Sequence, residues 1–187
     1  MNVLVVLAHP RSTSLTGKAA EAFAIAATER GHMIEWADLV AERFDPVLRE
    51  ADEPDWNNGR KVYSAEVRQE MARIEHNHAT VMFFPVFWWS VPAILKGWID
   101  RVWNNGWAYG DRKFPQRRVW MVGIAGTLPD AYQKRGYDNA MQTQLNTGIL
   151  GYCGVAEHRL ELLYGSIDGE PRTIEILAAA RALGAAF

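Results

Sequence analysis

The chain has 187 residues, a formal net charge of −2 and 49% hydrophobic residues, which suits a single domain over residues 1–187 with a core of its own. A charge so close to neutral gives no electrostatic reason to expect nucleic acid or an anionic membrane as a partner. No stretch reaches the length of a membrane-spanning helix, and we expect no signal peptide, because the first residues lack a basic flank.

Cys153 is the only cysteine, so an internal disulfide is impossible and a reducing, cytoplasmic setting is the natural inference. We interpret Cys153 itself as a buried, inert thiol. The notable excess is aromatic, with eight Trp, six Tyr and seven Phe. Part of that excess is expected to line a binding site or an interface.

The chain opens with an apolar strand over residues 2–8, followed by a polar loop over 9–14 and a helix over 15–30 that Gly31 ends. Free N–H groups, the positive end of the helix dipole and nearby Ser and Thr hydroxyls favour an anion at the helix start. The loop matches neither a Walker loop nor G-x-G-x-x-G, so a flavin phosphate or pyrophosphate fits better than ATP. The alternative is a helix cap without a ligand.

A second strand is predicted over residues 33–39, an irregular excursion over 41–59, and a helix over 63–76. His76 and His78 are two residues apart, which is wrong for one helix face. No carboxylate stands at ligand spacing from them, so we predict no metal site.

Residues 79–103 are the most informative stretch. Val81–Phe84 is a strand covered on both faces, and Pro85 stops it. Ser90 is expected to cap the next helix, with Pro92 in its first turn. The rings of Phe87, Trp88 and Trp89 lie between Pro85 and Ser90, at the edge where open parallel sheets bind ligands. They therefore predict a platform for a flat ligand. The alternative is that these indoles belong to the core or to a subunit contact.

A fourth strand is predicted over residues 119–125, helical structure over 129–150, an edge strand over 155–164 and a last helix over 170–183. This alternation predicts an α/β, flavodoxin-like three-layer sandwich with a five-stranded parallel sheet in the order 2-1-3-4-5. In that order the hydroxyl-rich loop and the aromatic loop follow neighbouring strands. Their convergence indicates a flavin site.

Four segments resemble the flavodoxin-like NAD(P)H:quinone reductases, a family that includes DT-diaphorase, modulators of drug activity and reductases that accompany potassium efflux systems. They are His9-Pro10-x-x-x-Ser14, the block from Phe84 to Val102, Gly106–Gly110 and Gly148–Gly154. The resemblance implies a homodimer, a non-covalent flavin, NAD(P)H as co-substrate, and two-electron ping-pong reduction of quinones or similar flat electrophiles.

The resemblance also implies roles for individual residues. Those expected at the flavin phosphates follow the first strand: His9, Arg11, Thr13, Ser14, Leu15 and Thr16. Those expected to wall the flavin ring follow the third strand: Pro85, Val86, Phe87, Trp88 and Trp89. Those expected at its pyrimidine edge end the fourth strand: Gly123, Ile124, Ala125 and Gly126. Tyr132 is the expected catalytic residue, and Tyr109 and Tyr152 are expected to reach into the partner subunit's substrate site.

The sequence departs from the family at two places. Gly123–Gly126 lacks the hydroxyl side chains of relatives, and Asp138 stands where relatives such as DT-diaphorase carry a histidine.

The compact chain favours FMN, with FAD as the alternative. The choice between NADH and NADPH and the physiological acceptor stay open. A second functional hypothesis is a flavin-binding regulatory subunit of a potassium efflux system, in peripheral contact with the transporter. A flavodoxin-type electron shuttle fits less well, because such shuttles are strongly acidic.

Overall fold

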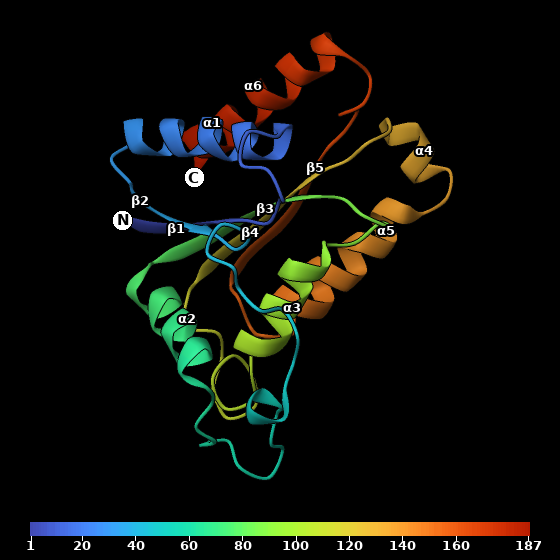
Figure 1. Ribbon diagram of the computed structural model, residues 1–187. Coiled ribbons are helices and arrows are strands. Elements are labelled where there is room, and N and C mark those ends of the chain that lie inside the picture. The colour runs from blue at the N-terminus through green and yellow to red at the C-terminus, as the bar shows by residue number, and fades with distance from the viewer.

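A five-stranded sheet forms the centre of the fold, and its strands are ordered β2-β1-β3-β4-β5 (Figure 1). All its neighbouring strands pair in parallel. The computed structural model describes residues 1–187. The strands are β1 (Asn2–Leu7), β2 (Met33–Asp38), β3 (Ala79–Pro85), β4 (Arg118–Ile124) and β5 (Glu157–Leu163). The predicted α/β class and strand order are confirmed.

Helices cover both faces of the sheet (Figure 1). On one face α1 (Leu15–Glu29) packs against α6 (Glu170–Ala186). On the other lie α2 (Ala65–His76), α3 (Ala93–Val102) and a π-helix, η2 (Gln142–Gly151). Two short helices, α4 (Pro129–Gln133) and α5 (Tyr137–Met141), lead into η2, and one turn of 3-10 helix, η1 (Glu50–Asp52), interrupts the excursion after β2.

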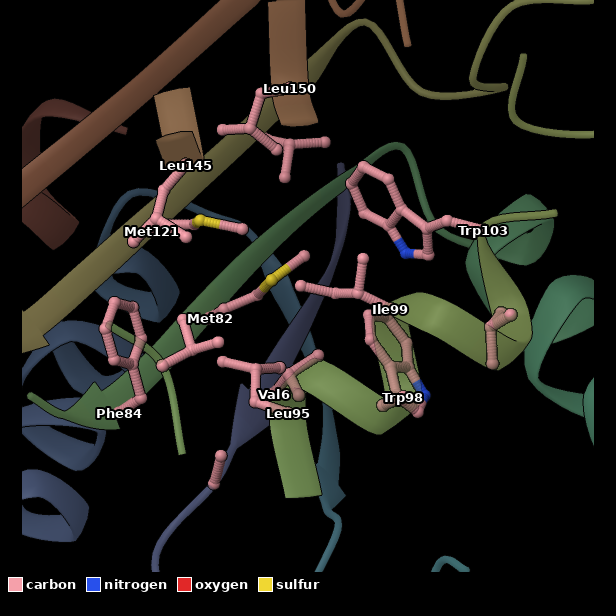
Figure 2. Close-up of a cluster of buried hydrophobic side chains, with 14 of the residues drawn as sticks. Val6, Met82, Phe84, Leu95, Trp98, Ile99, Trp103, Met121, Leu145 and Leu150 are labelled. Carbon is pink, nitrogen blue, oxygen red and sulfur yellow. The ribbon is translucent and has the colours of Figure 1, made fainter. Parts of the chain in front are cut away.

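The alternation of side chains along the central strands builds a core on each face. In β1, Val3 and Val5 pack under α1 and α6, whereas Leu4 and Val6 pack under α2 and α3. Every residue of β3 is buried, as expected for a strand covered on both sides. Figure 2 shows the second core, where Trp98 of α3 lies among methionine, leucine and isoleucine side chains. Its indole Nε1–H donates to Glu70 at 2.8 Å.

Several predicted boundaries are wrong. The prediction that Ser90 caps α3 fails, because Ser90 pairs with Phe87 and the N-cap residue is Pro92. Helix α2 begins at Ala65, after Ser64. In the segment predicted as helical over 129–150, the chain turns at Gly136, whose φ is 71°, and this turn separates α4 from α5. Helix α5 then continues directly into the π-helix η2.

The excursion after β2 is tied to the rest of the fold by a buried ion pair between Asp52 and Arg101. It extends with the loop after α3 to the end of the molecule farthest from α1 (Figure 1). The helices all lack the combined length and apolar character that a membrane span requires.

Candidate active site

Three loops leave neighbouring strands at the same level of the sheet. The Ala8 N–H donates to the Phe83 carbonyl at 3.0 Å, and the Val86 N–H donates to the Ile124 carbonyl at 2.9 Å. The loops after β1, β3 and β4 therefore start side by side. This is the edge at which open parallel sheets bind ligands.

The loop after β1 presents unused backbone donors. Ser14 is the N-cap residue of α1, and its hydroxyl accepts from the Gly17 N–H at 3.2 Å. A Cβ on Gly17 would lie 1.7 Å from the Ser12 carbonyl oxygen, so the loop closes tightly on the helix. At the start of the helix, the N–H groups of Ser12, Thr13, Leu15 and Thr16 donate no hydrogen bond within the chain, and the His9 N–H at the start of the loop donates none either. Such an array at the positive end of a helix fits a phosphate group.

His9 and Arg11 stand at the mouth of this cradle. The Arg11 N–H donates to His9 Nδ1 at 3.0 Å. Burial, followed by the charge of Arg11, lowers the pKa of His9. The imidazole is therefore neutral, and because Nδ1 accepts, Nε2 carries the proton and remains a donor. The exposed Arg11 guanidinium forms no ion pair, so it too is free to meet an anion.

The loop after β3 is a tight hairpin turn with an indole at each central position. Phe87 and Ser90 exchange backbone hydrogen bonds of 3.1 and 3.0 Å. Trp88 and Trp89 both have positive φ, 51° and 54°. Turns of this geometry normally use Asn and Gly, which tolerate positive φ. For other residue types the left-handed backbone conformation costs about 1–3 kcal/mol for each residue. Despite this strain, the turn keeps two large rings at the surface. Such an arrangement suits a ligand platform better than a core.

The two indoles differ in surroundings. Trp88 is 88% exposed, and Trp89 is 38% exposed because it stacks on Tyr137 with ring centroids 3.9 Å apart. The N–H groups of both residues donate no hydrogen bond within the chain. This turn therefore offers aromatic surface and backbone donors together. Pro85 and Val86 lie behind it, the first buried and the second partly buried.

The loop after β4 is held by the loop after β5. The carbonyl groups of Ala125 and Thr127 accept from the N–H groups of Ser166 and Gly165, at 3.0 and 3.1 Å. Gly123 and Ile124 are buried inside β4, where a Cβ on Gly123 would meet Leu162 at 2.9 Å, so Gly123 is needed for packing. The free N–H groups belong to Gly126, Thr127 and Leu128. Thr127 and Leu128 were not predicted as part of the site, although they directly follow the predicted Gly126 in the chain.

Tyr132 lies behind this loop. It is 4% exposed and packs edge-on against Tyr164 and Tyr137, at 5.1 and 6.1 Å between centroids. Burial raises the pKa of Tyr132, so its hydroxyl stays protonated at neutral pH. Asp138 accepts from the Asn139 N–H at 2.9 Å. Burial and then the Asp138 charge raise the pKa of Tyr164.

Tyr109 and Tyr152 come together, but not at the ends of the strands. Their ring centroids are 5.6 Å apart, and both line a groove of about 280 Å³ with Trp103 and Cys153. No residue of the loops after β1, β3 or β4 lines this groove. Cys153 is buried as predicted, and burial raises its pKa to about 11. Within one chain these two tyrosines are thus apart from the rest of the expected site residues.

Comparisons with known proteins agree with this architecture. The family described as having a flavodoxin-like fold matches residues 1–186. An uncharacterized NAD(P)H oxidoreductase of Escherichia coli K12 is 38% identical over 171 residues, covering 90% of this chain and 87% of the relative. The NAD(P)H dehydrogenase [quinone] 1 of Cavia porcellus is 27% identical over 188 residues, covering 87% of this chain and 68% of the relative.

Among solved structures, an NAD(P)H:quinone oxidoreductase from Methanothermobacter marburgensis superposes with a TM-score of 0.93 and 28% identity, covering 99% of this chain and 96% of that one. The chain belongs to the flavodoxin-like fold family. Within that family it is similar to NAD(P)H oxidoreductases and NAD(P)H:quinone oxidoreductases, and the resemblance noted in the sequence is confirmed.

Proposed function

We propose that this protein is a flavin-dependent NAD(P)H:quinone oxidoreductase. One observation carries the proposal: a cradle of free N–H groups after β1 lies beside a strained turn of exposed indoles after β3. The first suits the phosphate and the second suits the flat ring of one molecule, a flavin. The names of the oxidoreductase relatives support the same reaction.

The chain would hold the flavin with backbone and aromatic groups. The cradle after β1, with His9 Nε2–H and Arg11 at its mouth, would bind the phosphate. The indoles of Trp88 and Trp89 would wall the ring. The free N–H groups of Gly126 and Thr127 would meet its pyrimidine edge and stabilise negative charge there. The flavin, when bound, supplies the chemistry by accepting a hydride from NAD(P)H and passing it to a quinone.

We propose FMN as the flavin, because one helix start with four unused N–H groups suits a single phosphate. FAD is the alternative, which mass spectrometry of the released flavin separates from FMN. The protein is proposed to act in the cytoplasm, on the evidence of one buried cysteine. Nothing in the fold or in the named relatives favours a potassium-efflux subunit.

A homodimer is part of the proposal. The groove that holds Tyr109 and Tyr152 is apolar, and Leu48 and Tyr152 in it are exposed. A second copy of the chain would cover this surface and receive both rings beside its own flavin. Tyr109 and Tyr152 would then form the substrate side of the partner's flavin site. Within one chain the groove is lined by no residue of the loops after β1, β3 and β4, so it does not contribute to that chain's own flavin site.

The main test is optical. The purified protein should be yellow, or become yellow on addition of FMN or FAD, and should bleach with NADPH or NADH under anaerobic conditions. Colour should return when a quinone is added, and initial rates should follow ping-pong kinetics. Colourless protein that takes up neither flavin would refute the proposal.

The dimer is tested by complementation. One variant, Gly17→Val, closes the phosphate cradle, and the other, Tyr109→Ala with Tyr152→Ala, removes the tyrosines. Co-expression of the two should give heterodimers with one intact site each, and about a quarter of wild-type activity if subunits pair at random. Activity no greater than the sum of the separate variants would mean that each chain uses its own tyrosines or neither.

A further inference from the structure

A second hollow, of about 390 Å³, lies between the loop that precedes α2 and the loop that follows α3. Its lining has four basic side chains and no carboxylate; they are Arg60, Lys61, Arg68 and Arg112. Tyr63 and Trp107 contribute aromatic wall. No residue of the three strand-end loops takes part, so this hollow is separate from the proposed flavin site.

The arginines of this hollow are unpaired. Eight of the fifteen arginines in the chain form ion pairs. The exposed guanidinium groups of Arg60, Arg68 and Arg112 form neither an ion pair nor a hydrogen bond within the chain. Lys61 instead donates to the Glu53 carbonyl at 2.7 Å and so braces the rim. Three like charges around one hollow repel each other, and a bound anion would remove that repulsion.

The nearby acids do not neutralise these arginines. Glu75 accepts the Trp107 indole N–H at 2.7 Å, and Asp111 lies against Gly59. Neither carboxylate is within ion-pair distance of a basic side chain of the hollow. The guanidinium groups of Arg60, Arg68 and Arg112 therefore stay free to meet an anion, although the whole chain carries a net charge of −2.

The floor of the hollow is rigid. The Tyr63 hydroxyl donates to the Asn105 carbonyl at 2.9 Å and ties the two loops together. A Cβ on Gly106 would lie 1.9 Å from the Gly59 carbonyl oxygen, so the loops touch backbone to backbone. A surface already shaped in the free protein spends less free energy on ordering when a ligand binds.

We propose that this hollow binds a phosphate or pyrophosphate group of a small molecule, with Arg60, Arg68 and Arg112 as donors. Guanidinium groups match phosphate oxygens with pairs of parallel hydrogen bonds. The volume falls in the ordinary range of small-ligand sites. One source of this chemistry is the phosphate end of NAD(P)H, which rests on the proposed function. The other is a separate phosphorylated effector.

The first experiment measures binding without turnover. Inorganic pyrophosphate is titrated calorimetrically into flavin-saturated protein, so that the cradle after β1 is already filled. We expect saturable 1:1 binding that weakens at least about tenfold in the Arg68→Gln/Arg112→Gln variant and as salt is raised. Arg43→Gln, which removes another exposed and unpaired arginine, should bind like the wild type. Absent binding, or equal binding in the Arg68→Gln/Arg112→Gln variant, would overturn the proposal.

The second experiment identifies the source. If the phosphate belongs to the co-substrate, the Arg68→Gln/Arg112→Gln variant should raise the KM for NADPH about tenfold and leave kcat unchanged. Loss of pyrophosphate binding with unchanged KM for both nucleotides would support a separate effector. If the protein takes up no flavin, the proposed function is refuted. The phosphate site is still supported in that case if the protein binds pyrophosphate and the Arg68→Gln/Arg112→Gln variant does not.

Discussion

Trp89 and Tyr137 stack with their ring centroids 3.9 Å apart and their planes inclined by 28°. The contact joins the strained turn after β3 to the start of α5, two segments that are 48 positions apart in the chain. Because both central residues of the turn are left-handed, something outside the turn must help to hold it. The stack is the contact that does so for Trp89.

Replacing Tyr137 by alanine should therefore weaken flavin binding. An aromatic pair contributes about 0.5–1.5 kcal/mol beyond burial, which corresponds to about a 2- to 12-fold rise in Kd. Tyr137→Phe keeps the ring and should bind like the wild type. Titration of the flavin-free protein, followed by quenching of flavin fluorescence, measures both. Tighter binding in Tyr137→Ala would show instead that the stack competes with the flavin for the face of Trp89.

The phosphate cradle gives a second prediction. In Gly17→Ala the new methyl group would lie 1.7 Å from the Ser12 carbonyl oxygen, so the loop must move away from the helix. The free N–H groups would no longer converge, and flavin affinity should fall at least about tenfold. Gly151→Ala is the matched control, because its nearest neighbours would stand at 3.5 Å or more. Equal flavin affinity in the two variants would show that the cradle after β1 does not bind the flavin.

Much of the fold could be predicted from the sequence because periodicity reports burial directly. The fully apolar β3 and the alternation of strands and helices indicated the sheet order, which the structure confirms. The residues at three strand ends indicated a candidate flavin site, and the roles of those residues stay predictions. Cap details were less accessible. Ser90 is a good capping residue in isolation, yet its backbone is used by the turn with Phe87. That pairing depends on the left-handed conformations of Trp88 and Trp89, for which these residue types give no local signal.

The hollow with three arginines was also beyond sequence analysis. Arg60, Arg68 and Arg112 are spread over 52 positions and look like ordinary surface charges. Only the contact between the loops at Gly59 and Gly106 brings them around one space. The Trp89–Tyr137 stack was missed for the same reason, since it depends on where α5 begins after Gly136.

Tyr132 is the side chain on which the chemistry can be tested most directly. Burial raises its pKa above the usual value of 10.0, so the hydroxyl remains a donor at neutral and mildly alkaline pH. We expect Tyr132 to donate a proton in the reaction step, and on that expectation Tyr132→Phe should lower kcat about tenfold or more with little change in the KM for NAD(P)H. Any alkaline loss of wild-type kcat that comes from this group should have its midpoint above pH 10.0. If kcat is unchanged in Tyr132→Phe, the role of Tyr132 is structural, through its packing against Tyr164, and not catalytic.

The ion pair of Asp52 and Arg101 should control stability and its dependence on pH. The Asp52 carboxylate lies 2.8 Å from Arg101 Nη2, and the two residues are 1% and 3% exposed. Ser64 adds hydrogen bonds to Asp52 from its backbone and its hydroxyl, at 2.8 and 3.0 Å. Asp52→Asn leaves a buried guanidinium with fewer partners, so the free energy of unfolding at pH 7 should fall by about 3 kcal/mol. Asp100→Asn, in the exposed pair with Lys96, should cost under about 1 kcal/mol.

The pH dependence follows from the pKa of Asp52. Burial alone would raise this pKa, but the hydrogen bonds from Arg101 and Ser64 outweigh burial and lower it below the usual 3.8. As the pH falls, the unfolded chain therefore takes up the proton first. The stabilisation is complete above about pH 5 and is lost as the pH falls through 3.8 and then through the lower folded-state pKa. Denaturant unfolding at several pH values should show this loss in the wild type and in Asp100→Asn, with a shallower slope in Asp52→Asn. Equal slopes in all three would mean that other carboxylates dominate acid unfolding and that Asp52 is not the group that controls it.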